Sequence, residues 1–228
     1  MGALEDHRWG PRTRAIHAGG QPDPEMGARQ VPIYQTTSFV FEDVADAADL
    51  FALQKYGNIY SRLGNPTVAA FEERCASLEG GIGAVAAASG QAAATMLLTS
   101  LAGAGDHVVA SSELYGGTYV LLNVTLRRLG IETTFVAADD PAAFAAAIEP
   151  GRTKLLYTET ISNPAGTVAD LETLGEIAHA AGIPLAVDAT LSTPHLCRPL
   201  EHGADIVIHS ATKFLGGHGT SLGGVVID

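Results

Sequence analysis

The chain has 228 residues, of which 46% are hydrophobic and 17% charged, as in a globular protein of one large domain. Its net charge of −12 argues against nucleic acid and against an anionic membrane surface as partners, because both attract basic patches. Two cysteines without CxxC spacing, and no apolar run of signal-peptide or membrane-spanning length, favour a cytoplasmic protein without a disulfide framework.

The first part of the chain, from residue 1 to about residue 27, is polar and rich in Gly, Pro and Arg. This composition predicts an arm without a hydrophobic core of its own. The arm is either a loose terminus or a segment that reaches over a partner subunit. We place its end at residue 64, which leaves residues 1–64 as the arm and residues 65–228 as one large domain.

From residue 65 onward, short apolar runs alternate with helical patterns. A helix over 67–78 is predicted because Asn65 suits an N-cap, Pro66 suits the first helical position, and Gly80 and Gly81 end it. The predicted strands are 84–88, 107–110, 133–136, 155–158, 185–187, 206–209 and 224–227. The predicted helices between them are 91–101, 118–129, 141–148 and 171–181.

This order of elements predicts an α/β fold: a three-layer α/β/α architecture with a mostly parallel seven-stranded sheet. Ligands of such sheets bind beyond the carboxyl ends of the strands, so the residues that follow each strand are the candidates for a site. After the run 84–88, Ser89-Gly90-Gln91 opens a helix, and free N–H groups at a helix N-terminus attract phosphate. A plain strand-to-helix turn is the alternative.

Asp188 and Lys213 follow two further strands. A carboxylate at the end of a buried strand is costly unless it meets a cation, although Asp188 could also be a helix cap or part of a core salt bridge. The chain has three lysines, and Lys55 and Lys154 lie away from the carboxyl ends of the strands. Lys213 alone lies beyond the carboxyl end of a predicted strand and is therefore the candidate for a functional amine. The alternative is that it is a surface lysine on a loop.

Taken together, these features describe one ligand. Pyridoxal 5'-phosphate requires an amine for a Schiff base, an acid that keeps its ring nitrogen protonated, and a phosphate site. The hydroxyls of Ser210 and Thr212 are presented beside the amine. Lys213 must lose its proton to act as a nucleophile or base, and a cationic neighbour or a dry pocket would lower its pKa.

Motifs for other chemistries are absent or misplaced. Gly81-Ile82-Gly83 precedes a strand, whereas a dinucleotide fingerprint follows one, and there is no Gly-Lys-Ser/Thr phosphate loop. The eight histidines form no HExxH motif. His202 and His209 fall on a predicted helix end and on a strand, so we expect no metal site and regard His209 as a packed core histidine.

Four stretches of the sequence resemble the pyridoxal-phosphate-dependent enzymes of cysteine and methionine metabolism. The resemblance covers nearly the whole chain and implies the large domain of a type I pyridoxal-phosphate-dependent transferase. The four stretches are VPIYQTTSF at 31–39, YSRLGNPT at 60–67, LYGGTY at 114–119 and SATKFLGGHG at 210–219.

The resemblance also implies a role for each candidate residue. Lys213 resembles the Schiff-base lysine and proton shuttle, and Asp188 resembles the partner of the ring nitrogen. Tyr115 resembles the tyrosine that stacks on the cofactor ring and assists proton transfer, and Asn163 resembles a polar residue close to the ring oxygen. The implied phosphate site consists of Ser89, Gly90, Gln91, Ser210 and Thr212.

Tyr60 and Arg62 resemble residues that reach the cofactor phosphate of the neighbouring subunit, a role suited to the planar guanidinium of arginine. The active unit would then be at least a dimer, and the resemblance implies a homotetramer built from two such dimers. The other implied partners are small-molecule substrates, without nucleic acid or membrane.

Within the family, the chain resembles the O-acetylhomoserine sulfhydrylases, because Gln91 and Thr220 stand where lyases and cystathionine synthases usually have Met and Asp. The implied reaction, in methionine biosynthesis, is a γ-replacement on O-acetyl-L-homoserine. Sulfide or a thiol displaces acetate, and homocysteine or methionine is formed. A cystathionine or methionine γ-lyase is the alternative, and a non-catalytic role in assembly is a third.

The resemblance implies a second, C-terminal domain that would follow Asp228 and carry the arginine that grips the substrate's α-carboxylate. We therefore expect the chain by itself to be poorly active. We also expect it to expose a face that normally packs against that domain.

Overall fold

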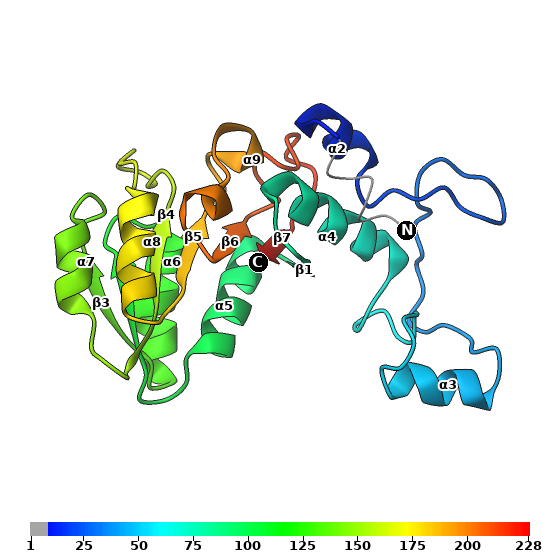
Figure 1. The fold of residues 1–228 in the computed structure, drawn as a ribbon, viewed down its shortest axis with the longest axis horizontal. Coiled ribbons are helices and arrows are strands. Elements are labelled where there is room, and N and C mark those ends of the chain that lie inside the picture. The colour runs from blue at the N-terminus through cyan, green and yellow to red at the C-terminus, as the bar shows by residue number, and fades with distance from the viewer. Residues whose placement is uncertain (1–8) are drawn as a thin grey trace. The chain divides into compact units, whose positions relative to one another are not determined.

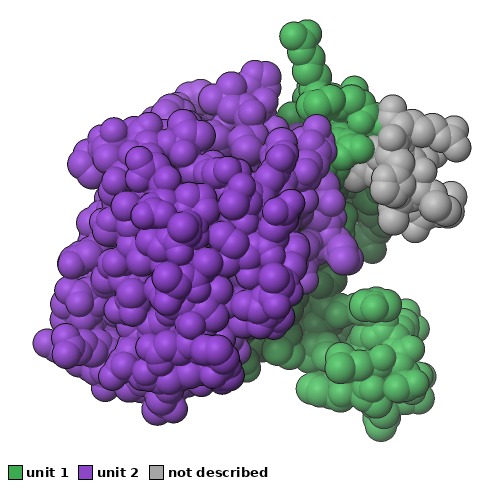
Figure 2. Space-filling view, turned by 60° about the vertical axis from the view of Figure 1, so that its left-hand side comes forward, with its two compact units in different colours: residues 1–77 green, residues 78–228 purple. Residues whose placement is uncertain are grey.

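A computed structural model of the chain describes residues 9–228; residues 1–8, the start of the predicted arm, lie outside the described part. The chain forms two compact units, residues 1–77 and residues 78–228, which Figure 2 colours separately. The division falls within helix α4 (Pro66–Glu79). The boundary predicted at residue 64, between arm and large domain, stays a prediction.

Unit 1 contains two short helices, α2 (Pro11–His17) and α3 (Val44–Phe51), and most of α4. Neither α2 nor α3 is predicted from the sequence, because they have only seven and eight residues and lie among Gly, Pro and Asp residues. Helix α3 begins where the carboxylate of Asp43 accepts a hydrogen bond from the N–H of Asp46 at 2.8 Å.

The predicted start of α4 is confirmed by its hydrogen bonds. Asn65 Oδ1 accepts from the N–H of Thr67 at 2.9 Å, and Pro66 is the first helical residue. Asn65 Nδ2 also donates to the carbonyl of Tyr34 at 2.9 Å, which ties the segment before the helix to an earlier part of unit 1. The helix ends at Gly80, whose φ of 83° suits glycine.

Unit 2 is built from seven strands: β1 (Ala84–Ala87), β2 (His107–Ser111), β3 (Glu132–Val136), β4 (Thr153–Glu159), β5 (Leu185–Asp188), β6 (Ile206–His209) and β7 (Gly224–Ile227). They form one sheet in the order β1-β7-β6-β5-β4-β2-β3. Neighbouring strands from β3 to β6 are parallel, whereas β7 runs antiparallel to both β1 and β6. The predicted seven-stranded, mostly parallel sheet is therefore confirmed.

The helices of unit 2 lie mainly between strands in the chain. They are α5 (Gly90–Leu101), α6 (Gly116–Val120), the π-helix η1 (Leu121–Leu126), α7 (Pro141–Ala147), α8 (Leu171–Ala180), α9 (Thr193–Leu196) and the 3-10 helix η2 (Pro199–His202). Apart from the helix predicted at 118–129, every predicted element has a counterpart whose bounds differ by at most two residues.

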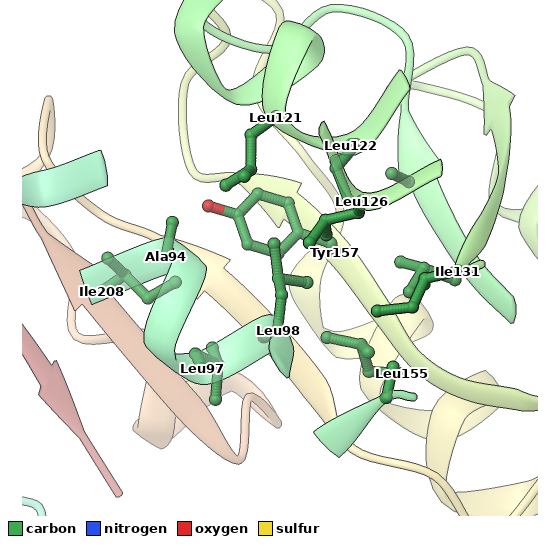
Figure 3. Packing of buried hydrophobic residues seen from close by; sticks show 14 of the residues in the cluster. Ala94, Leu97, Leu98, Leu121, Leu122, Leu126, Ile131, Leu155, Tyr157 and Ile208 are labelled. Carbon is green, nitrogen blue, oxygen red and sulfur yellow. The ribbon is translucent and has the colours of Figure 1, made fainter. Parts of the chain in front are cut away.

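Helices cover both faces of the sheet, as Figure 1 shows, and this confirms the three-layer architecture. Helices α5 and η1 pack on one face, against Val108 and Tyr157 among others. Helices α7 and α8 pack on the other face, against Val109 and Leu156. Residues next to each other in β2 and β4 thus point to opposite faces. Figure 3 shows Tyr157 surrounded by apolar side chains of the first cluster.

The helix predicted over 118–129 is interrupted by the π-helix η1, which follows α6. A π-helix has a wider turn, so residues five apart lie on the same side of it. Leu121, Leu122 and Leu126 are all buried against the sheet as a result. A regular α-helical period, which is what the sequence predicts, would place Leu122 and Leu126 on one side but would turn Leu121 about 140° away from Leu126.

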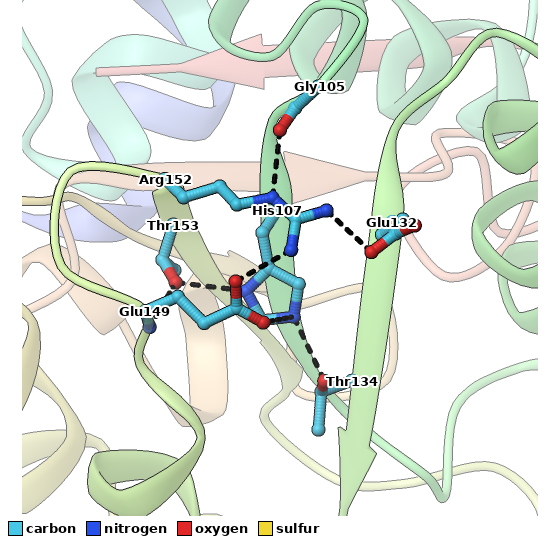
Figure 4. Close-up of polar contacts among 7 residues, drawn as sticks. All are labelled: Gly105, His107, Glu132, Thr134, Glu149, Arg152 and Thr153. Carbon is cyan, nitrogen blue, oxygen red and sulfur yellow. Dashed lines mark hydrogen bonds and ion pairs between the residues drawn. The ribbon is translucent and has the colours of Figure 1, made fainter.

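A buried histidine holds the amino-terminal ends of three strands together, at the edge of the sheet shown in Figure 4. His107 on β2 is hydrogen-bonded through Nδ1 to Thr153 Oγ1 on β4 and through Nε2 to Thr134 Oγ1 on β3, both at 2.9 Å. Arg152 lies above it and bonds Glu132 Oε2 at 2.5 Å. Burial is the main cause that lowers the pKa of His107.

We predict that His107→Leu lowers the free energy of unfolding by about 2 kcal/mol near pH 7.5, because two buried hydrogen bonds are lost. The difference from wild type should shrink as the pH falls. The folded-state pKa of His107 is lowered, so protonation favours the unfolded wild-type chain, and the variant lacks this penalty. Urea unfolding of both proteins near pH 7.5 and near pH 5.5 measures this, and a difference that grows at the lower pH would contradict it.

Candidate functional site

The candidate site lies at the carboxyl ends of β4, β5 and β6, which run parallel and therefore end at the same edge of the sheet. Glu159 at the end of β4 is the Cα partner of Asp188 at the end of β5. Asp188 is in turn the partner of Ile208, two residues before Ser210. Two carboxylates and a serine thus meet at this edge.

Asp188 is connected to Ser210 through Thr190. Asp188 Oδ1 accepts hydrogen bonds from the N–H of Thr190 at 2.9 Å and from its Oγ1 at 2.5 Å. Thr190 Oγ1 itself accepts from the N–H of Ser210 at 2.8 Å. Burial raises the pKa of Asp188, and the bonds to Thr190 and the charge of His209 oppose that shift. Asp188 Oδ2 makes no hydrogen bond within residues 9–228, so it can meet a cationic donor.

The turn from β1 into α5 has the features expected of a phosphate site. Ser89 caps the helix by accepting from the N–H of Ala92 at 3.1 Å. The amides of Gly90 and Gln91 lie in the first turn and have no acceptor within the helix. A Cβ on Gly90 would lie 2.6 Å from the Cβ of Ser210. Only glycine lets the helix N-terminus approach the loop after β6 this closely, so free N–H groups and the Ser210 hydroxyl share one place.

The side chain of Gln91 joins α5 to α6. Gln91 Nε2 donates to Thr118 Oγ1 at 2.9 Å, and Thr118 is fully buried. A Cβ on Gly117 would lie 3.3 Å from Gln91 Cδ and 2.7 Å from Tyr115 Cε1. Gln91 and the ring of Tyr115 therefore both lie next to the position that a side chain at residue 117 would occupy. Tyr115 remains about half exposed, as a ring that can cover a ligand must be.

One buried carboxylate connects the loops that carry Tyr115 and Asn163. Glu159 Oε1 accepts from the N–H of Tyr115 at 2.7 Å, and Oε2 accepts from the N–H of Asn163 at 3.1 Å. Glu159 is only 6% exposed. Burial is the main cause that raises the pKa of Glu159 to about 7; the neighbouring Asp188 adds to the increase, and the two N–H bonds oppose it.

Lys213 lies on the turn that follows β6. Its backbone N–H donates to the carbonyl of Ser210 at 3.1 Å, and Thr212 Oγ1 accepts from the N–H of Gly223 at 3.1 Å. The Lys213 side chain is exposed, and its amine makes no hydrogen bond or ion pair within the described part of the chain. Such an amine is accessible to a carbonyl compound.

Tyr60 and Arg62 belong to unit 1. An isolated bridge between Ser38 and Tyr60 holds this segment, and the N–H of Ser61 donates to the carbonyl of Thr37 at 2.9 Å. The guanidinium carbon of Arg62 lies 5.7 Å from the centre of the Tyr60 ring, within the range of a cation–π contact. Both side chains are exposed.

Three residues of the site were not predicted from the sequence: Thr118, Glu159 and Thr190. Glu159 follows the predicted strand 155–158 directly, so the rule that selects Asp188 also selects Glu159. Thr190 stands two residues after an aspartate, a spacing typical of a local side-chain-to-backbone turn. The role of Thr118 depends on a contact with another helix, and its sequence carries no signal for it.

Within residues 9–228, no group of three or more His, Cys, Asp and Glu side chains is placed to hold a metal ion. In the same range, no helix has the length and apolar character needed to cross a membrane.

The sequence is similar to a family of known enzymes. The family described as Cys/Met metabolism PLP-dependent enzyme matches residues 12–228. The chain is 51% identical over 218 residues to the O-acetyl-L-homoserine sulfhydrylase of Leptospira meyeri, covering 96% of this chain and 49% of that protein. It is 54% identical over 217 residues to the homocysteine synthase of Schizosaccharomyces pombe, and this match covers 95% of this chain and 50% of that protein. The chain thus spans about half the length of these curated relatives.

Solved structures share the fold. One is a protein from Campylobacter jejuni that is assigned as an O-acetylhomoserine (thiol)-lyase and has a pyridoxyl-lysine monophosphate in its structure. Its TM-score is 0.93 and its sequence identity is 40%, and the match covers 96% of this chain and 54% of that chain. The cystathionine γ-lyase of Lactobacillus plantarum, in complex with L-serine, has a TM-score of 0.87 and a sequence identity of 38%. This match covers 96% of this chain and 55% of that chain.

We predict that Glu159→Gln removes a pH-dependent cost of folding. The pKa of Glu159 rises from 4.5 to about 7 in the folded state, so keeping the carboxylate ionised there costs about 3 kcal/mol at alkaline pH. The sign follows from proton uptake: the folded state binds more protons between these values, so wild-type stability falls as the pH rises through them. The variant should therefore gain stability relative to wild type by up to that amount between about pH 4.5 and pH 8.

Denaturant unfolding of the full-length protein and of Glu159→Gln near pH 5 and near pH 8 measures this gain. If the free energy of unfolding changed with pH in the same way in both proteins, Glu159 would be ionised in the folded state without a cost in stability. Glu132→Gln, at the opposite edge of the sheet, is a matched control for the loss of one carboxylate.

Proposed function

The chain belongs to the pyridoxal-phosphate-dependent enzymes of cysteine and methionine metabolism, and we propose on this premise that the whole protein is an O-acetylhomoserine sulfhydrylase. It would replace the γ-acetoxy group of O-acetyl-L-homoserine by sulfide or a thiol. The C–O bond at the γ-carbon breaks, a C–S bond forms, acetate leaves with the bonding pair, and homocysteine or methionine is the product.

One observation carries this proposal. Two relatives that are 51% and 54% identical to this chain over the aligned 218 and 217 residues are named O-acetyl-L-homoserine sulfhydrylase and homocysteine synthase. The fold alone does not discriminate, because a cystathionine γ-lyase has nearly the same backbone. The reaction is therefore proposed from sequence similarity and from the site, not from the sheet.

The site fits the cofactor of this family. The free amides of Gly90 and Gln91 and the nearby hydroxyl of Ser210 suit its phosphate, and the close approach of Gly90 to Ser210 would be blocked by any side chain. Asp188 Oδ2 suits a protonated ring nitrogen, since a cation there would favour the ionised carboxylate. When bound, pyridoxal phosphate supplies an electron sink for the substrate's α-carbon.

The residues of the chain supply attachment and proton transfer. The Nζ of Lys213 would attach the cofactor through its aldehyde and, once released, would take the substrate's α-proton and return it later. The ring of Tyr115 would cover the cofactor, and its hydroxyl would assist proton traffic. Ser89 and Thr212 would complete the phosphate site, and Asn163 would lie close to the ring oxygen.

The finer properties of the whole protein are also proposed. Tyr60 and Arg62 would reach the phosphate of a neighbouring subunit, so that each active site is shared within a dimer. Two such dimers would form a homotetramer, and the protein would act in the cytoplasm. The exposure of Tyr60 and Arg62 supports the proposed contact with a neighbouring subunit, because the planar guanidinium of an exposed arginine can bind phosphate oxygens in pairs.

A γ-lyase is the second candidate, favoured by the similarity to the Lactobacillus plantarum enzyme. It would release a 2-oxo acid and ammonia from the amino acid substrate and would need no added sulfide. Product analysis with and without sulfide therefore separates the two functions.

We predict that the full-length protein with O-acetyl-L-homoserine and sulfide forms homocysteine and acetate. Lys213→Ala should abolish both this activity and the visible absorbance of the bound cofactor, because the amine that attaches it is gone. Borohydride treatment of wild type, followed by peptide mapping, should place the cofactor on Lys213. Absence of homocysteine formation, or a cofactor attached to another lysine, would overturn the proposal.

We also predict that two defective variants restore each other's activity if the site is shared. Arg62→Ala and Lys213→Ala chains should each be nearly inactive, whereas their co-expression should yield mixed dimers with one complete site. Co-expression of Lys213→Ala with Asp188→Ala is the control, because both residues lie in unit 2 and no mixed dimer regains a complete site. Equal activity of the two mixtures would argue against a role of Arg62 in the neighbouring subunit.

A further inference from the structure

A buried carboxylate outside the predicted cofactor contacts connects two of them. Glu159 accepts one N–H bond from Tyr115, in the loop after β2, and one from Asn163, in the loop after β4. Each oxygen takes one of the two bonds, so the carboxylate bridges two loops that are 48 residues apart in sequence. We propose that Glu159 is a positioning residue that fastens the Tyr115 loop to the Asn163 loop and so fixes both for the cofactor.

A second acid connects the same two loops. Glu113 Oε2 accepts from Ser162 Oγ at 3.2 Å and from Thr167 Oγ1 at 2.5 Å. The N–H of Thr167 in turn donates to Ser162 Oγ at 2.9 Å, which closes the loop on itself. Two acids therefore connect the loop after β4 to the loop after β2. Glu113 bonds two hydroxyl groups of the loop after β4, and Glu159 bonds the backbone of both loops.

The two acids differ in their surroundings. Glu113 is partly exposed and bonds hydroxyl groups, which can rotate to donate or accept. Glu159 is buried and bonds backbone N–H groups, which only donate. A protonated carboxyl group carries a donor on one of its oxygens, so it opposes one of these two N–H groups. The contact of Glu159 with both loops is therefore strongest in the ionised form, in which both oxygens only accept.

Burial, with a smaller contribution from the charge of Asp188, makes the ionisation of Glu159 dependent on pH near neutrality. Asp188 on the adjacent strand raises the pKa of Glu159, Glu113 stands in the Tyr115 loop, and Tyr157 precedes Glu159 on β4. None of the groups that shift its pKa within residues 9–228 is a cation. With a pKa of about 7, Glu159 is ionised above that pH and increasingly neutral below it, so the contact between the loops weakens as the pH falls.

Hydrogen–deuterium exchange by mass spectrometry tests the contact directly in the full-length protein without added cofactor. After correction for the intrinsic pH dependence of exchange, peptides that contain the amides of Tyr115 and Asn163 should exchange roughly tenfold faster near pH 6 than near pH 8, as expected for loss of a bond to a charged group. In Glu159→Gln, exchange should be fast at both pH values, because an amide offers one acceptor and one donor group. Glu132→Gln should behave as wild type.

That the contact fixes the loops for the cofactor rests on the proposed function, and it is tested separately by measuring cofactor affinity. Fluorescence titration with pyridoxal 5'-phosphate near pH 8 should show at least tenfold weaker binding to Glu159→Gln than to Glu132→Gln. Unchanged exchange at Tyr115 and Asn163 in Glu159→Gln would overturn the proposal, as would faster exchange with unchanged cofactor affinity. Failure of wild type to bind pyridoxal 5'-phosphate would instead refute the proposed function, while the exchange data would still decide whether Glu159 holds the loops.

Discussion

Two carboxylates stand side by side at the edge of a parallel sheet, and the rest of the site is arranged around them. Glu159 and Asp188 are Cα partners in adjacent strands, where like charges repel and burial adds to the cost of ionisation. The register follows from the apolar runs that precede each acid, because these runs must fill the core on both faces of the sheet. The structure stabilises the two acids in different ways: Asp188 through the side chain and N–H of Thr190, and Glu159 through backbone N–H groups of two loops.

A buried pair of a histidine and a glutamate lies close to this edge of the sheet. His209 Nε2 at the end of β6 is hydrogen-bonded to Glu79 Oε1 at the end of α4, and both side chains are almost fully buried. Burial raises the pKa of Asp188, and the charge of His209 is one of the influences that oppose this increase. Glu79 Oε2 and His209 Nδ1 have no hydrogen-bond partner within residues 9–228. A buried pair satisfied on one side only is a weak source of stability.

Most of the fold and part of the site were predictable from the sequence. Short apolar runs predicted every strand of the sheet, and residues that follow strands identified Asp188 and the turn at Gly90. The strand order and the reversed direction of β7 were not predictable, because pairing is decided by segments far apart in the chain. The π-helix was missed because an α-helical period also fits its leucines in part. Glu159 and Thr190 carry a signal in the sequence that was not used, whereas Thr118 carries none, because its role depends on a contact with another helix.

The loops of the site are short and rich in small residues, so their shapes depend on side chains that bridge them. Gln91 bridges α5 and α6 through Thr118, Thr190 bridges β5 and the loop after β6, and Glu159 bridges the loops after β2 and β4. Each bridge ends on a backbone amide or a buried hydroxyl, and such partners have little freedom to adjust. Of the three bridging side chains, only Glu159 is itself charged, and burial disfavours this charge. The folded state therefore loses stability by keeping this carboxylate ionised, and what it gains in exchange is local: two loops held in one arrangement beside Asp188.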